Sequence, residues 1–168
     1  MLVGCSSVLP SPRPGDREAP ALGFFSRIRV PNGFEPALRL KGTGVQIFRC
    51  EAFGREYLWH FRQPEANLTD DRGQLVARHG ANFTFEHRDG SRLVAKITAY
   101  DDAPSPTDLR WVLMSAKSFG HGALASIAYV QRVNTHGGMP PPSCEASEVN
   151  RVLRVDFSAD FIFYRARD

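Results

Sequence analysis

The densest run of polar side chains that could hold a ligand lies in the second half of the chain. It consists of Gln131, Arg132, Asn134, Thr135 and His136, followed by Gly137 and Gly138. Amides, a guanidinium and backbone N–H groups next to glycine can orient an anionic or hydroxyl-rich molecule. The run therefore predicts a site for a small molecule or glycan. The alternative is structural: Arg132 pairs with Asp160, and the other residues shape a turn.

A histidine beside a carboxylate is the second arrangement that could do chemistry. His79 would act as a general base if Glu65 or Asp160 lay next to it, because such a pair can be poised near neutral pH. This set of residues predicts a small hydrolytic or isomerising enzyme that acts on an envelope sugar or a small acid. The alternative is that His79 is a structural histidine with satisfied hydrogen bonds.

Other reaction classes lack the residues they need. The five histidines form no HExxH or HxH spacing and have no Cys-x-x-Cys partner, so no metal site is predicted. The absence of a G-x-S-x-G segment argues against a serine hydrolase. Gly42-Thr43-Gly44 precedes a predicted strand and lacks a third glycine, so it does not form a phosphate-binding loop. No cofactor is expected.

The start of the chain resembles the lipobox of bacterial lipoproteins. In Leu2-Val3-Gly4-Cys5, the cysteine would be the lipidated residue. A signal peptide needs a charged and an apolar region, about fifteen residues or more, before that site. We therefore expect the true start to lie upstream of Met1. Cys5 would then anchor the protein on the periplasmic side of the inner or outer membrane, or the protein would be secreted. The alternative, with Met1 as the true start, is a cytoplasmic protein.

The two remaining cysteines form a candidate disulfide. Cys50 lies in a predicted strand, and Cys144 lies in a proline-rich loop. With Cys5 assigned to a lipid anchor, these thiols are natural disulfide partners in an oxidising compartment. The alternative is two unrelated buried thiols in a cytosolic protein.

Composition divides the chain into a leader and one domain. The 168 residues suit a single hydrophobic core. Residues 8–20 contain four prolines and alternating charges, so they cannot bury enough apolar surface to fold and should form a linker. We expect residues 1–25 to comprise the lipobox-like start and flexible linker, and residues 26–168 to form a single all-β domain.

The excess positive charge lies largely outside that domain. Residues 1–41 carry six Arg or Lys and three Asp or Glu, a net charge of +3, whereas residues 42–168 carry fifteen of each sign. A nucleic-acid-binding protein clusters basic residues on its folded surface to neutralise phosphates. The charge balance therefore argues against a nucleic-acid partner.

The domain shows the patterns of strands separated by turns. Asp89-Gly90 predicts a two-residue hairpin loop between residues 83–87 and 93–97. Seven or more such segments, without a convincing helix, predict an antiparallel β-sandwich or barrel. The expected core residues are Val45, Ile47, Trp59, Phe61, Phe85, Ile97, Trp111, Leu113, Ile127, Tyr129, Val133, Phe161 and Phe163.

A series of segments spread along the domain also carries a family resemblance. The series comprises residues 44–50, 59–61, 64–68, His79, 89–91, 111–114, 131–138, Cys144 and 158–164. Together, and above all in the segments QRVNTxGG and SADxxFY, they resemble the family catalogued as domain of unknown function 3455 over about residues 26–165. The resemblance implies a secreted or envelope protein without an established activity. One departure is Asn82-Phe83-Thr84-Phe85, where the family tends to have Pro-Thr-Trp.

Two functional hypotheses follow from these observations. The first is a periplasm-facing binding or structural module with a small-ligand site, because no catalytic arrangement stands out. The second is the small enzyme based on His79.

Overall fold

The computed structural model describes residues 19–168, so Cys5 and most of the expected linker lie outside the described residues. The strands are β1 (Phe34–Phe53), β2 (Glu56–Thr69), β3 (Leu75–Gly80), β4 (Thr84–His87), β5 (Arg92–Asp101), β6 (Trp111–Phe119), β7 (Ile127–Gly137) and β8 (Val152–Ala166). Two short 3-10 turns cover Ala81–Phe83 and Ala146–Glu148. No helix within residues 19–168 is long and apolar enough to cross a membrane.

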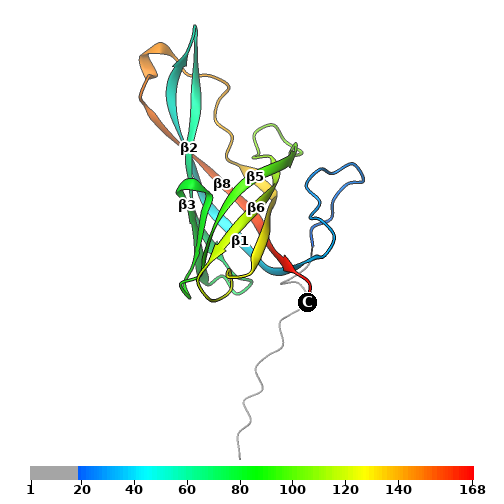
Figure 1. Cartoon of the computed structure of the whole chain (residues 1–168). Coiled ribbons are helices and arrows are strands. Elements are labelled where there is room, and N and C mark those ends of the chain that lie inside the picture. The colour runs from blue at the N-terminus through cyan, green and yellow to red at the C-terminus, as the bar shows by residue number, and fades with distance from the viewer. Residues whose placement is uncertain (1–18) are drawn as a thin grey trace, which may run out of the picture.

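The eight strands form a closed antiparallel barrel. Each strand pairs with the next along the chain, and β8 pairs with β1 to close the sheet. Figure 1 shows the strands crossing the barrel obliquely. The all-β prediction is confirmed, and of the two expected architectures the chain adopts the barrel.

Large side chains fill the barrel interior. Phe85, Phe161 and Phe163 are among the largest fully buried residues, and the ring of Phe85 contacts the rings of Phe161 and Phe163 edge to face at centroid distances of 5.5 and 5.4 Å. A β-carbon at Gly42 would collide with the ring of Phe161, so this position on β1 needs glycine. Because the interior is packed with side chains, it serves as the hydrophobic core.

The far ends of β1 and β2, residues 48–61, project beyond the barrel as an arm (Figure 1). The loop between β7 and β8 runs beside the arm, where the backbone N–H of Cys144 donates to the carbonyl of Tyr57 at 3.0 Å. Cys50 on β1 forms a disulfide with Cys144, which confirms the predicted pair. The disulfide thus fixes the loop against the arm.

A second apolar layer covers the outer face of β6, β7 and β8. The segment before β1 packs there through Ile28, which is fully buried with Val133 and Ile162. The side-chain amide of Gln131 donates to the carbonyl of Ile28 at 2.6 Å, and Gln131 accepts from the hydroxyl of Tyr164 at 2.6 Å. These buried hydrogen bonds hold the N-terminal segment on the barrel.

Asp89 joins two loops at one end of the barrel. Its carboxylate accepts hydrogen bonds from the hydroxyl of Ser91 at 2.6 Å and from the backbone N–H of Ala123 at 2.8 Å. The Ser91 hydroxyl in turn accepts from the N–H of Leu124, whose side chain is fully buried. The turn after β4 therefore supports the loop between β6 and β7, which places Leu124 in the core.

Candidate functional site

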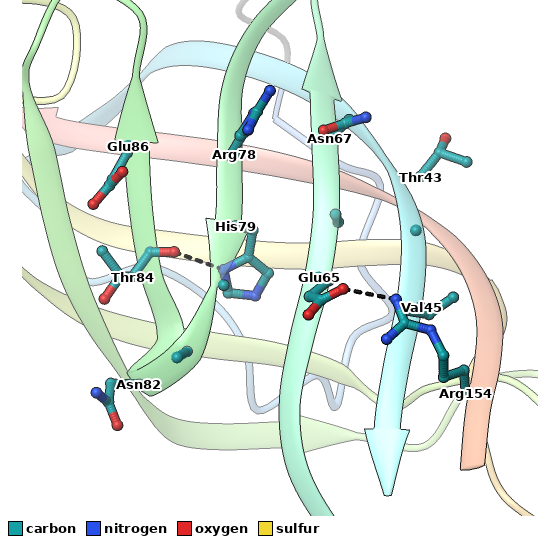
Figure 2. Close-up of a pocket in the computed structure, with 14 residues that line it drawn as sticks. Thr43, Val45, Glu65, Asn67, Arg78, His79, Asn82, Thr84, Glu86 and Arg154 are labelled. Atoms are coloured by element: carbon teal, nitrogen blue, oxygen red, sulfur yellow. Dashed lines mark hydrogen bonds and ion pairs between the residues drawn. The ribbon is translucent and has the colours of Figure 1, made fainter. Parts of the chain in front are cut away.

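A polar hollow lies on the outer face of the barrel, over β1 to β4 and the neighbouring part of β8. Its volume is about 730 Å³. Figure 2 shows side chains from all five strands around it. The polar residues of the lining are Thr43, Glu65, Asn67, Arg78, His79, Asn82, Thr84, Glu86 and Arg154.

Strand alternation directs most of these side chains outward. On β2, Pro64, Ala66 and Leu68 are buried, so the alternating residues Glu65 and Asn67 face the solvent. Arg78 on β3 is exposed next to the buried His79. The hollow thus combines outward-facing polar groups with one inward-facing histidine at its base.

Two glycines shape the floor of the hollow. At Gly44, a β-carbon would collide with the backbone carbonyl of Glu65, because β1 and β2 approach closely there. At Gly80, at the end of β3, a β-carbon would meet no atom within 4 Å. The absence of a side chain at Gly80 therefore leaves open space in the hollow.

An ion pair crosses one wall of the hollow. A guanidinium nitrogen of Arg154 on β8 lies 2.7 Å from a carboxylate oxygen of Glu65 on β2, across β1 (Figure 2). Both side chains are about half exposed, so the pair adds little stability. Its effect is to order the two side chains and to neutralise the charge of Glu65.

The turn between β3 and β4 has an unusual backbone. Asn82 and Phe83 both have positive φ angles, 57° and 53°. Asparagine tolerates this region, whereas phenylalanine is strained there. The centroid of the Phe83 ring lies 5.8 Å from that of His79 and 5.9 Å from that of Phe61, and this packing holds the turn. The turn places Asn82 at the rim of the hollow.

His79 is neutral in the folded protein. Its Nδ1 lies 3.1 Å from the carbonyl of Thr84, so Nδ1 carries the proton and Nε2 has a lone pair (Figure 2). Burial lowers the pKa of His79 to about 3; the hydrogen bond to Thr84 opposes this, and the charge of Arg132 adds to it. An imidazole with so low a pKa is a weak base at neutral pH. Its role as a general base stays a prediction.

The two carboxylates proposed as partners of His79 lie in different places. Glu65 lines the same hollow as His79. Asp160 is not among the lining residues; its carboxylate lies 2.7 Å from Arg39 and accepts a hydrogen bond from Asn134 at 2.8 Å. The structure therefore brings His79 and Glu65 to one site and leaves Asp160 outside it.

The polar run on β7 contacts protein atoms. Gln131 binds Ile28 and Tyr164, as described above, and Thr135 donates to the carbonyl of Leu109. Arg132 is buried and donates to the carbonyl of Arg110 at 2.9 Å, while Asn134 bonds to Asp160. These hydrogen bonds give the run a structural role, and its ligand-binding role stays a prediction.

Within residues 19–168, no group of three or more His, Cys, Asp or Glu side chains is arranged to hold a metal ion. Of the polar lining residues, sequence reasoning selected only Glu65 and His79 and missed the others, among them Asn67, Arg78 and Arg154. The available signal was weak, because each is a polar side chain of the kind that many surface residues carry.

The comparisons with known proteins place the chain by family. The family described as "Protein of unknown function (DUF3455)" matches residues 31–165. No curated protein and no solved structure matches the chain.

Proposed function

The chain belongs to the DUF3455 family, and from its outer hollow we propose that it is a cell-envelope module that binds a small acidic sugar. The observation that carries the proposal is the convergence of polar side chains from five strands on a hollow of about 730 Å³. That volume lies in the ordinary range for small-molecule sites.

The neutral lining groups support a hydroxyl-rich ligand. Asn67 and Asn82 offer amides, and Thr43 and Thr84 offer hydroxyls, all of which line the hollow. Such groups both donate and accept hydrogen bonds, as sugar hydroxyls do. Glu65 and Glu86 add acceptors for hydroxyl protons.

Arg78 supports an acidic group on that ligand. Among residues 19–168, no carboxylate forms an ion pair with Arg78, although Glu86 is its cross-strand neighbour. The other arginine of the lining, Arg154, is paired with Glu65. A carboxylate on the ligand would therefore find one guanidinium with donors to spare.

The disulfide supports an envelope location. Structural disulfides persist in oxidising compartments and are rare in the cytosol. The Cys50–Cys144 bond is therefore consistent with export and with a lipid anchor at Cys5. Labelling cells with radioactive palmitate tests this part of the proposal: we expect label on the wild-type protein in the membrane fraction and none on Cys5→Ser. An unlabelled wild-type protein that fractionates with the cytosol would refute the envelope location.

Calorimetric titration of the full chain, as the Cys5→Ser variant, tests the ligand class. N-acetylglucosamine and N-acetylmuramic acid form a matched pair of probes, since the second carries an additional lactyl carboxylate. We expect the acidic sugar to bind about tenfold more tightly, because a charge-assisted hydrogen bond is worth more than about 1.4 kcal/mol. Arg78→Gln should abolish this difference and leave the neutral sugar unaffected.

Filling the hollow tests its location. Gly80 has an extended backbone, φ −153°, and open space around its β position, so Gly80→Leu should fold normally and abolish binding of both sugars. Gly23→Leu, also in open space, is the matched control. Binding that survives in Gly80→Leu, or an absence of binding by the parent protein, would refute the proposal. Mass spectrometry of the same mixtures would detect turnover, the outcome that favours the enzyme hypothesis.

A further inference from the structure

Two phenylalanines stand out from the N-terminal segment into solvent. Phe24 is 87% exposed and Phe25 is 90% exposed, the highest values among the exposed large apolar residues of the described chain. Their rings contact each other edge to face at 5.1 Å. In Figure 1 this segment, at the blue end of the colour bar, forms a loop at the side of the barrel. Exposed aromatic pairs of this kind mark contact surfaces.

The loop that presents them is held on both sides. The carboxylate of Asp101 accepts hydrogen bonds from the hydroxyl of Ser26 at 2.6 Å and from the backbone N–H of Arg27 at 2.9 Å. The carbonyl of Gly23 accepts from the backbone of Ser26 and from the side chain of Arg29. Ile28, three residues after Phe25, is buried. The two rings are therefore fixed outward, so little ordering entropy is lost when they bind.

The charge around the rings favours an anionic surface. Arg27 and Arg29 are exposed and lie two and four residues after Phe25. Residues 1–41 carry the whole net charge of +3, and residues 42–168 are balanced. Asp101, the nearby carboxylate, is already occupied by the loop. Aromatic rings flanked by arginine are typical of segments that lie in the interface of an anionic membrane.

We propose that Phe24 and Phe25 insert into the interfacial region of an anionic lipid bilayer, with Arg27 and Arg29 at the phosphate headgroups. This contact does not depend on the ligand hollow or on lipidation. Where Cys5 is lipidated, the loop adds a second attachment nineteen residues after the first, counted from 5 to 24. Two weak attachments together give stable membrane binding where one is marginal.

Co-sedimentation with lipid vesicles tests the proposal on the full chain as Cys5→Ser, so that no covalent lipid contributes. The probes are vesicles of phosphatidylcholine alone and of phosphatidylcholine with phosphatidylglycerol, about 3:1. We expect binding to the anionic vesicles to fall about tenfold or more in the double variant Phe24→Ser/Phe25→Ser, because each ring leaves water on insertion. Arg27→Gln should weaken binding to the anionic vesicles only, and added salt should do the same.

The control is Phe53→Ser, which removes a half-exposed phenylalanine from the tip of the arm and should bind like the parent. Equal binding by the parent and the double variant would overturn the proposal, as would an absence of binding to anionic vesicles. Sedimentation velocity tests the competing explanation, that the two rings form a dimer contact. A dimer that the double variant abolishes, without vesicle binding by the parent, would assign the rings to a second copy of this chain and contradict the membrane contact.

Discussion

His79 stacks on Phe85, with ring centroids 3.9 Å apart and ring planes inclined by 13°. The pair connects the outer hollow to the aromatic core, because His79 lines the hollow and Phe85 contacts Phe161 and Phe163. A change in the charge of the imidazole would therefore affect both the site and the packing of the core.

This connection predicts a pH-dependent stability. In the folded protein the pKa of His79 is about 3, against 6.5 when unperturbed, so the unfolded chain takes up the proton at higher pH. The free energy of unfolding should be greatest above about pH 6.5 and should fall as the pH drops toward 3. Urea denaturation between about pH 7 and pH 4 would show this slope in the wild type and a smaller slope in His79→Gln. Equal slopes in the two proteins would contradict the neutral, buried histidine.

The two glycine positions of the hollow should differ sharply in how well they tolerate substitution by alanine. Gly44→Ala should lower the melting temperature strongly, because its β-carbon would collide with the backbone carbonyl of Glu65. Gly80→Ala should have little effect, because the space around it is open. Thermal denaturation of both variants checks the prediction, and similar melting temperatures would show that β1 and β2 do not approach each other as described.

The disulfide should stabilise the fold by constraining the unfolded chain. It closes a loop with a sequence separation of 94, which corresponds to at most about 4.7 kcal/mol on the chain-entropy estimate. The double variant Cys50→Ala/Cys144→Ala should unfold at a lower denaturant concentration than the wild type. A reductant should lower the stability of the wild type and leave that of the double variant unchanged. A wild-type protein that is equally stable with and without a reductant would argue against a contribution from this bond.

The contacts of Asp89 should couple two loops. The hydroxyl of Ser91 and then the N–H of Ala123 hold the pKa of Asp89 well below its ordinary 3.8, so its contribution to stability is lost only as the pH falls below that value. Asp89→Ala should lower the melting temperature at neutral pH. Gly122→Ala should also lower it, since the new methyl group would collide with the Asp89 carboxylate. The double variant should lower the melting temperature by less than the sum of the two single decreases. Strictly additive decreases would argue against contact between the loops.

Local sequence patterns were sufficient to predict the all-β class and the hairpin but not every detail of the turn. Asp89-Gly90 does connect β4 and β5, yet the backbone pair His87 and Ser91 closes a three-residue loop rather than the predicted two-residue one. The side chain of Asp89 explains the difference in part. It bonds to Ser91 and to Ala123, 34 residues away, and such a tertiary contact leaves no local pattern.

Alternation along β1 separates two faces without showing which one is inside. Val45 and Ile47 were expected in the core, but the buried residues of this stretch are Gln46, Phe48 and Cys50, while Val45 and Ile47 are half-buried. Ile97 on β5, also expected in the core, is 38% exposed and lies at an irregularity in the pairing with β6. Phe85, Phe161 and Phe163 are buried as predicted. A polar residue such as Gln46 in the core runs against the hydrophobic pattern on which the prediction relied.

The hollow depends on barrel closure, which a single sequence does not reveal. Glu65 and Arg154 are 89 residues apart and meet because β8 pairs with β1. His79 and Glu65 were both proposed as site residues from their chemistry, and they do line one hollow. Arg78 and Asn67 could not be predicted as site residues, because many outward-facing strand residues are polar and their neighbours across the sheet are not known from the sequence.

The most direct test of the proposed binding site is an amide chemical-shift titration of the isotope-labelled full chain, as Cys5→Ser, with N-acetylmuramic acid. We expect the largest shifts on Asn67, Arg78, Gly80 and Asn82 around the hollow, and little change in residues 131–138 on β7. Shifts centred on residues 131–138, or no shifts at saturating sugar, would contradict a binding site at the hollow.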